Sequence, residues 1–255
     1  MKHKIAILNQ KGGVGKTTTA VNLSAQIAAD GFSVLLVDID PQGNATSGLG
    51  LNKNAQSLTT YDVLIKQLTI DKAVQKTTVP NLFILPANGS LAASEIDLIN
   101  QPRREHRLDT ALEESPYDFV IIDCPPALGL LTINALTAAN KLLIPVQAEY
   151  YALEGLGQLL EITQRIRQSL NPKLDILGVI LTMYDKRTTL SENVLMEVKK
   201  HFGDKVFKTY IPRNVKLAEA PSYGKTIYQH DKWSKGSRTY KQLTKEVLSR
   251  LGERK

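Results

Sequence analysis

A glycine-rich segment near the start of the chain has the residue types that could hold the phosphates of a nucleotide. It reads KGGVGKTT over residues 11–18, after an apolar run and before a helical pattern. Backbone N–H groups at such a strand-to-helix turn bind anions, and glycines let the backbone approach a phosphate closely. Lys16 would contact the β and γ phosphates, and the Thr17 hydroxyl would bind Mg²⁺. The phosphate contacts that the segment predicts are Gly12, Gly13, Val14, Gly15, Lys16, Thr17 and Thr18.

The loop departs from the common phosphate-loop pattern at its first position. That pattern is G-x-x-x-x-G-K-[ST], but Gln10 stands where the pattern has its first glycine. The prediction therefore depends on the place of the loop between a strand and a helix. A second lysine, Lys11, immediately precedes the glycines. Because Lys16 alone is enough to hold the phosphates of one nucleotide, Lys11 needs a separate role.

Carboxylates follow two other apolar runs. Asp123 ends FVIID, and Asp38 and Asp40 end LLVDID. Residues two apart in a strand share a face, so Asp38 and Asp40 could both point at the phosphates. Asp40 lies nearer the loop and is the better candidate to orient an attacking water, whereas Asp123 has the place of an acid directed at Mg²⁺. The predicted metal ligands are Thr17, Asp40 and Asp123.

The elements that must position these residues alternate along the chain. Nearly continuous Val, Ile and Leu runs indicate strands buried on both faces, which is typical of a parallel sheet. We expect strands at residues 4–8, 33–40, 82–87, 117–126, 141–148, 175–184 and 205–211. We expect helices at residues 17–30, 91–100, 104–114, 153–169, 189–201 and 236–251. The pattern predicts an α/β fold of one domain over residues 1–255, a doubly wound and mostly parallel sheet with helices on both faces.

Composition narrows the class of protein. The net charge is +7, and residues 182–255 hold 17 Lys/Arg against 8 Asp/Glu, whereas residues 1–181 hold 15 against 17. A positive excess confined to one part of the chain favours a polyanionic partner. The single cysteine, Cys124, excludes a disulfide framework within one chain and indicates a reducing compartment. We expect neither a signal peptide nor a transmembrane helix, since no apolar run approaches ~18 residues.

Five segments resemble those of the ParA/Soj-type partitioning ATPases of chromosomes and plasmids. They are KGGVGKTT (11–18), VDIDPQGNAT (37–46), IIDCPPALGLLTINAL (121–136), VQAEYYALEGL (146–156) and IPRNVKLAEAPSYGK (211–225). The resemblance extends over nearly the full chain and implies a P-loop ATPase with the deviant Walker A pattern x-K-G-G-x-x-K-[ST], which accommodates Gln10. It implies that Lys11 reaches across a nucleotide-sandwich dimer to the partner's phosphates. By the same resemblance Asp40 positions the hydrolytic water, Asp123 is the Walker B acid, and Lys11, Lys16 and Asp40 are catalytic.

The resemblance also implies ligands and partners. The chain lacks the Asn/Thr-Lys-x-Asp element of guanine-specific loops, and the family's base is adenine, held near Met183, Pro212, Arg213 and Asn214. An ATP-bound homodimer would bind double-stranded DNA without sequence preference through Arg187 and Lys216. Further candidates are Lys186, Lys232, Lys235, Arg238 and Lys241. A ParB-type DNA-binding protein would stimulate slow, Mg²⁺-dependent hydrolysis, and the protein would be cytoplasmic and associated with the nucleoid. We expect no helix-turn-helix, since the first strand begins within four residues of Met1.

Three other readings stay open at this point. A MinD-like ATPase that cycles on a membrane shares the loop, and Tyr240, Leu243, Val247, Leu248 and Leu251 form an apolar stripe that could lie on lipid. We expect this stripe to pack against the core, because it lacks Phe and Trp. A reductase like the nitrogenase iron protein needs a pair of cysteines from each subunit, which Cys124 alone cannot supply. A non-catalytic nucleotide switch is the third reading.

Overall fold

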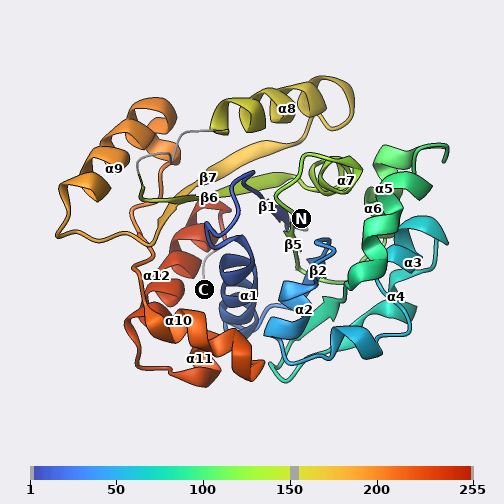
Figure 1. Ribbon diagram of the computed structural model, residues 1–255, viewed down its shortest axis with the longest axis horizontal. Coiled ribbons are helices and arrows are strands. Elements are labelled where there is room, and N and C mark those ends of the chain that lie inside the picture. Colours follow the sequence, from blue (N-terminus) through green and yellow to red (C-terminus); the bar gives the residue numbers. More distant parts are fainter. Residues whose placement is uncertain (1–2, 150–154, 254–255) are drawn as a thin grey trace.

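The computed structural model describes residues 3–149 and 155–253 of the 255-residue chain. Seven strands form one sheet in the order β3-β4-β2-β5-β1-β6-β7 (Figure 1). The strands are β1 (His3–Ile7), β2 (Val34–Asp38), β3 (Gln75–Lys76), β4 (Leu82–Leu85), β5 (Phe119–Asp123), β6 (Lys141–Gln147) and β7 (Asp175–Thr182). Every neighbouring pair is parallel except β3 with β4. The predicted α/β fold with a mostly parallel sheet is confirmed.

Helices cover both faces of the sheet (Figure 1). The α-helices are α1 (Lys16–Ala29), α2 (Asn44–Gly48), α3 (Thr60–Ile65), α4 (Ile70–Ala73), α5 (Ser94–Asp97), α6 (Arg107–Ala111), α7 (Leu130–Ala138), α8 (Leu156–Ser169), α9 (Thr189–Phe202), α10 (Val215–Glu219), α11 (Ile227–His230) and α12 (Lys235–Arg250). Short 3₁₀ turns are η1 (Lys53–Ala55), η2 (Gly89–Ala93), η3 (Arg104–His106), η4 (Gly203–Lys205) and η5 (Ala220–Tyr223).

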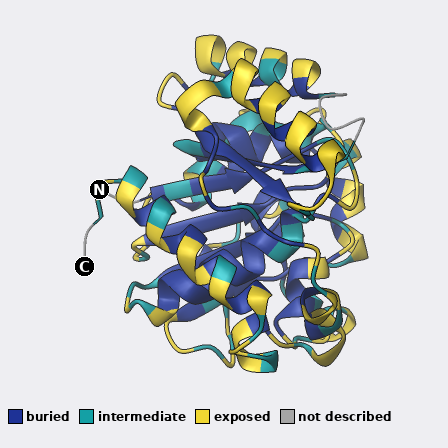
Figure 2. Cartoon of the chain, turned by 90° about the vertical axis from the view of Figure 1, so that its left-hand side faces the viewer, coloured by how far each residue is buried: buried dark blue, intermediate teal, exposed yellow. Residues whose placement is uncertain are grey.

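Two apolar cores lie on the two faces of the sheet. In β5, Val120 and Ile122 join the core under α3, α6, α7, α8 and α9. Phe119 and Ile121 alternate with them and join the core under α1, α2, α10, α11 and α12. All four side chains are almost fully buried, and Figure 2 shows buried strands between helices whose outer faces are exposed. Burial on both faces explains why the strands read as continuous apolar runs.

The glycine-rich loop and the candidate acids lie together at the carboxyl ends of three neighbouring strands. β1 lies between β5 and β6, and Ile7 at its carboxyl end is paired with Asp123 of β5. On its other side Asp123 is paired with Asp38 of β2. The loop before α1 and both acidic strand ends therefore lie side by side, as expected where the strand order reverses in an open α/β sheet.

The predicted strand at residues 205–211 is wrong. This segment runs beside β7 and makes only isolated bridges, Val179 with Val206 and Tyr184 with Pro212. The physical reason is that a side chain of α12 binds two backbone amides of this segment. The Glu246 carboxylate accepts from Lys208 N at 2.8 Å and from Thr209 N at 3.0 Å. These amides are therefore not available to continue a ladder with another strand.

Two predicted helices are shorter than expected. The 91–100 region holds η2 and the four residues of α5, and the 104–114 region holds η3 and α6. The Glu95 side chain of α5 accepts from Leu130 N at 2.8 Å and Leu131 N at 3.2 Å, so this turn caps α7. The predicted helices at 189–201 and 236–251 are confirmed as α9 and α12, and that at 153–169 as α8 where it is described. Residues 150–154, which belong to a segment that carries the family resemblance, lie outside the described residues.

The apolar stripe of α12 packs into the core. Tyr240, Leu243, Val247 and Leu248 are 0–7% exposed. The Tyr240 hydroxyl lies 3.1 Å from the Thr19 hydroxyl of α1. The expectation that these four residues face the core is confirmed, and the face is not available to lie on lipid in this conformation.

Candidate functional site

The glycine-rich loop connects β1 to the first turn of α1, and its lysine is enclosed. Gly12 and Gly13 are exposed, whereas Lys16 is only 7% exposed. Gly13 and Gly15 have φ of +74° and +88°, a left-handed conformation that favours glycine. Lys16 Nζ donates to the Lys11 carbonyl at 3.0 Å, so the lysine curls back under the loop. This arrangement holds a cation beneath exposed backbone, as a phosphate cradle requires.

The loop is fastened to two strands by side chains. Asn9 Nδ2 donates to the Pro145 carbonyl of β6 at 2.7 Å, and Asn9 Oδ1 accepts from Lys11 N at 3.0 Å. At the other end, the Thr182 hydroxyl of β7 donates to the Val14 carbonyl at 2.7 Å. These bonds fix the loop before any ligand binds. Neither Asn9 nor Thr182 was among the predicted site residues, although both stand at the carboxyl end of a strand.

Asp123 has the properties of a carboxylate kept for a cation. Both of its oxygens are buried and have no hydrogen-bond partner among the described residues. Burial raises the pKa of Asp123 well above its ordinary value, the Asp38 carboxylate raises it further, and Thr17 and Lys16 lower it. Unpaired buried carboxylate oxygens beside a threonine hydroxyl form an oxygen donor set, which suits Mg²⁺. No cluster of three His, Cys, Asp or Glu side chains suited to a metal ion occurs among the described residues, so phosphate and water would supply the remaining ligands.

The two acids after β2 differ in their partners. Asp38 is fully buried, and its oxygens accept from Asp40 N at 3.2 Å, Thr46 N at 2.8 Å and the Thr46 hydroxyl at 2.7 Å. Burial raises the pKa of Asp38 to about 6, and the Thr46 hydrogen bonds oppose that rise. Asp38 therefore holds the following turn together and does not have both oxygens free for phosphates. Asp40 is 7% exposed, and within the described residues its carboxylate accepts only from Gln42 N, at 2.9 Å.

Buried charge surrounds Lys16. Burial lowers the pKa of Lys16, and the Asp123 and Asp40 carboxylates oppose that decrease. Lys16, Asp40 and Asp123 follow three different strands, β1, β2 and β5, whose carboxyl ends lie side by side. The structure therefore brings these three predicted residues together. Thr17 and Thr18 begin the helix beside them and are partly exposed.

The Lys11 side chain belongs to a second cluster of charged residues. Its ammonium lies 3.8 Å from a Glu149 carboxylate oxygen, and Arg213 NH2 lies 3.5 Å from the other oxygen of Glu149. Such long, partly exposed ion pairs contribute little to stability. Lys11 is therefore held loosely at the surface of its own chain. Glu149 was inside a segment that resembles the family, but no chemical reason in the sequence marked it.

The predicted base-binding residues lie next to one another and next to the loop. The bridge between Tyr184 and Pro212 joins the segment after β7 to residues 211–214. Met183 has φ +51°, a strained conformation for a non-glycine residue of the kind found at ligand sites. Arg213 is exposed, while Asn214 caps α10, since its side-chain oxygen accepts from Leu217 N at 3.2 Å. The side-chain oxygen of Asn214 therefore already accepts a hydrogen bond within its own chain.

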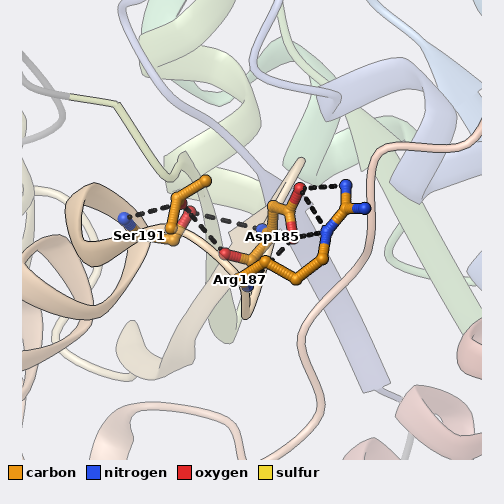
Figure 3. A network of polar contacts seen from close by, with 4 residues as sticks. Asp185, Arg187 and Ser191 are labelled. Atoms are coloured by element: carbon orange, nitrogen blue, oxygen red, sulfur yellow. Dashed lines mark hydrogen bonds and ion pairs between the residues drawn. The ribbon is translucent and has the colours of Figure 1, made fainter.

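Arg187 is exposed but has an acid partner on its own chain. Figure 3 shows its guanidinium against Asp185, with Arg187 NH2 at 2.7 Å and Nε at 3.0 Å from the two carboxylate oxygens. These hydrogen bonds lower the pKa of Asp185 below its ordinary value, and Lys235 contributes in the same direction. Asp185 N donates to the Ser191 hydroxyl at 3.2 Å, which fixes this turn to the start of α9 (Figure 3). Arg187 must exchange this partner for a phosphate if it binds DNA.

Lys216 has a similar arrangement. Its ammonium donates to Glu219 at 2.9 Å, and the Lys216 residue is exposed. That hydrogen bond raises the pKa of Lys216, and Asp231 and Tyr223 lie close enough to raise it further. Both predicted DNA-contact residues are therefore accessible and already paired.

Known proteins similar to this chain identify its family. The family model described as AAA domain matches residues 2–176. The sporulation initiation inhibitor protein Soj of Bacillus subtilis is 57% identical over 247 residues, which cover 96% of this chain and 98% of Soj. The chromosome partitioning protein ParA of Caulobacter vibrioides is 50% identical over 254 residues, 98% of this chain and 95% of ParA. The chain belongs to the ParA/Soj family of chromosome-partitioning ATPases.

Solved structures agree with the fold expected for the ParA/Soj family. A structure named cobyrinic acid a,c-diamide synthase from Mycobacterium smegmatis, with bound ADP and magnesium, has a TM-score of 0.87 at 37% identity, covering 99% of this chain and 96% of that one. The septum site-determining protein MinD from Pyrococcus horikoshii, complexed with Mg-ADP, has a TM-score of 0.78 at 27% identity, covering 99% and 98%. Within the described residues, no helix is both long and apolar enough to span a bilayer.

Proposed function

We propose that residues 1–255 act as one P-loop ATPase domain that dimerises on ATP, binds DNA non-specifically and moves DNA with a ParB-type partner. The observation that carries this proposal is the buried Lys16 beneath the glycine loop, on which the Asp123 and Asp40 carboxylates act electrostatically. Membership of the ParA/Soj family supports the ATPase reaction and the partitioning role. The ADP and magnesium named with the Mycobacterium smegmatis relative support ATP and Mg²⁺ as ligands.

Each residue of the loop has a distinct task in this proposal. The backbone amides of residues 12–18 and the Lys16 ammonium hold the phosphates, and Thr17 and Asp123 hold Mg²⁺ directly or through water. Mg²⁺, when bound, neutralises charge that develops on the phosphate oxygens. Asp40 positions and polarises the attacking water. Asp40 suits this task because its carboxylate accepts a single hydrogen bond within the described residues, from Gln42 N.

Lys11 acts in the second subunit of the dimer. Its side chain is partly exposed, and its ammonium lies 3.8 Å from its acid partner, Glu149. Exposed Gly12 and Gly13 leave room for a second loop to approach. A cation supplied from the partner would stabilise charge on the transferred phosphoryl group, which couples ATP binding to dimerisation.

Adenine binds between the segment that follows β7 and residues 211–214 in this proposal. The Met183 backbone strain and the bridge between Tyr184 and Pro212 support a preformed pocket there. Arg213 remains available at its rim. Asn214 would contribute through its amide nitrogen, because its oxygen caps α10.

The experiment that tests the function is DNA affinity measured against salt. The Asp40→Ala protein with ATP and Mg²⁺ should bind any DNA sequence alike, and without nucleotide it should bind weakly. Arg187→Ala or Lys216→Ala in that background should flatten the slope of log affinity against log salt by roughly one to two units, since each change occurs twice per dimer. Equal DNA affinity with and without ATP would refute the proposal.

A MinD-like membrane cycle is the second candidate, because a MinD structure is among the similar folds. The buried stripe of α12 favours the DNA reading, since a lipid-binding helix must expose its apolar face. Flotation with anionic liposomes in the presence of ATP separates the two. Under the DNA reading we also expect the protein in the cytoplasm on the nucleoid, and a ParB-type protein should accelerate its slow hydrolysis.

A further inference from the structure

Three large side chains are exposed on one short stretch of the basic C-terminal part. Trp233 is 76% exposed, Tyr223 is 66% exposed and Tyr228 is 51% exposed. Trp233 is the single tryptophan of the chain. It lies between α11 and the start of α12, where Trp233 N donates to Asp231 at 3.0 Å and Ser234 caps the helix. A single exposed apolar side chain is common, but several exposed aromatic groups that lie close together are typical of an interaction site.

A chain of contacts links the segment of Trp233 to Lys216, one of the two residues predicted to contact DNA. Glu219 accepts from the Lys216 ammonium at 2.9 Å and lies 3.5 Å from His230 Nε2. The Tyr223 ring stacks on His230 with centroids 5.1 Å apart, and Trp233 follows His230 by three residues. Lys235, two residues after Trp233, helps to lower the pKa of Asp185 after its main partner, Arg187. We call the exposed residues of this region, Lys216, Tyr223, Trp233 and Lys235 with Arg187, the Trp233 surface.

The charge of this surface is complementary to a polyanion. The Lys232 ammonium lies 5.1 Å from the centre of the Trp233 ring. Lysines and arginines exposed along it are Arg187, Lys216, Lys225, Lys232, Lys235 and Arg238. The acids near them are Asp185, Glu219 and Asp231. The balance is positive, and the aromatic rings stand among the cations, which is the combination that nucleic-acid surfaces present.

We propose that Trp233 contacts double-stranded DNA directly, with its ring against sugars and base edges while the neighbouring cations hold the phosphates. This inference rests on the proposed DNA-binding function and adds to it a contact that is not electrostatic. Every nucleotide of a duplex presents a sugar with an apolar face, so a contact with the sugars needs no particular sequence. Lys232, whose ammonium lies over the Trp233 ring, then binds a neighbouring phosphate.

The two kinds of contact differ in their dependence on salt. A cation on a phosphate releases counterions, so losing it flattens the slope of log affinity against log salt. An aromatic ring neutralises no phosphate. Trp233→Ala should therefore lower affinity by about tenfold or more at every salt concentration and leave the slope unchanged, whereas Lys216→Gln should change the slope.

The test measures DNA affinity and tryptophan fluorescence of the ATP-bound Asp40→Ala protein. DNA should quench or shift the fluorescence, which reports on Trp233 alone. Trp233→Phe should keep most of the affinity that Trp233→Ala loses. Ile96→Ala is the matched control, because Ile96 on α5 is 73% exposed and lies outside the Trp233 surface. The unfolding midpoint should be the same in all variants. ATPase turnover without DNA, measured with each substitution made alone in the chain that keeps Asp40, should also be unchanged.

Several outcomes would overturn the inference. Normal DNA affinity in Trp233→Ala, or fluorescence that DNA leaves unchanged, removes Trp233 from the contact while the salt slopes still support the proposed function. A flattened slope in Trp233→Ala means that the ring acts only by placing lysines. A fluorescence shift with anionic phosphatidylglycerol vesicles and none with DNA assigns the surface to a membrane. If no ATP-bound variant binds DNA, the proposed function itself fails.

Discussion

At the scale of single residues, the two lysines of the loop have opposite surroundings. Lys16 is buried beneath the loop, whereas Lys11 is partly exposed and lies 3.8 Å from Glu149. We expect Lys16→Ala to abolish ATP binding, because the cradle loses its own cation. Lys11→Ala should keep appreciable ATP binding but lose hydrolysis and weaken dimerisation. Nucleotide titration of the monomer and ATPase rates measure both effects.

The comparison between the two lysine variants decides the role of Lys11. Glu149→Gln serves as a control, since it frees Lys11 without removing its charge, and it should leave ATP binding intact. A Lys11→Ala protein that fails to bind ATP as completely as Lys16→Ala would show that Lys11 serves its own nucleotide.

Asp185 pairs with Arg187, which the proposed function assigns to DNA binding. Its carboxylate holds the Arg187 guanidinium with two short hydrogen bonds (Figure 3). Asp185→Asn should therefore raise DNA affinity, by roughly two- to fivefold for each copy, since an exposed pair of this kind is weak and its loss also removes a negative charge. Filter binding or fluorescence anisotropy at fixed salt measures the gain. Glu161→Gln, which removes an equivalent partner from Arg165 on α8, should change nothing.

At the scale of elements, Arg250 joins the end of α12 to the edge of the sheet. Its guanidinium donates to the carbonyls of Leu177, Lys205 and Val206 at 2.8–3.1 Å. It also lies 3.9 Å above the centre of the Phe207 ring. Arg250→Ala should lower the free energy of unfolding by about 2–4 kcal/mol, because three carbonyls lose a charged donor and a cation–π contact is lost.

Urea unfolding measures that loss. Lys245→Ala, at an exposed position of the same helix, is the matched control and should change stability little. Arg250→Lys should recover part of the loss, since a lysine keeps the charge but cannot reach three carbonyls with a planar fork. Equal stability of Arg250→Ala and Lys245→Ala would contradict this account of the helix.

The elements also show which parts of the fold the sequence could predict. Strands such as β2 and β5 were predictable because burial on both faces requires continuous apolar residues. The segment at 205–211, KVFKTYI, also contains β-branched and aromatic residues typical of strands, but the Glu246 carboxylate, distant in sequence, accepts from two of its amides. A long-range hydrogen bond of this kind leaves no periodic signal. β3 was not predicted because it is only two residues long, too short to show a period.

The site followed the same division. Lys16, Asp40 and Asp123 were predictable, because their residue types follow strands whose carboxyl ends must meet. The partners that decide which groups stay free were not. Thr46 donates to Asp38, the backbone of α10 donates to the Asn214 side chain, and Arg187 donates to Asp185. Each of these bonds depends on the exact course of a turn, which local composition does not specify.

At the scale of the whole molecule, dimerisation can be separated from turnover by two substitutions. A Cβ added at Gly12 would meet nothing within 4 Å, and Gly12 does not have positive φ, so Gly12→Val should fold normally. It should bind ATP yet remain monomeric, because a β-branched side chain would stand where two loops must approach. Asp40→Ala should instead accumulate as a dimer with ATP and Mg²⁺.

Sizing chromatography with ATP and Mg²⁺ distinguishes the two variants, and the protein without nucleotide is the reference. A dimeric Gly12→Val would place the subunit contact away from the loop. A monomeric Asp40→Ala that binds ATP normally would assign the water-activating role to another residue.

The pairing of the two ends of the chain has a consequence for its synthesis on the ribosome. His3 lies 2.8 Å from Glu253, and Thr19 lies 3.1 Å from Tyr240. The face of α1 that packs on α12 therefore has no cover until α12 has left the ribosomal tunnel. Contacts that span more than 200 positions form late in folding, and folding that depends on them is slow. We expect a nascent chain to acquire the complete nucleotide site only after α12 has emerged, so that shorter nascent chains do not bind ATP.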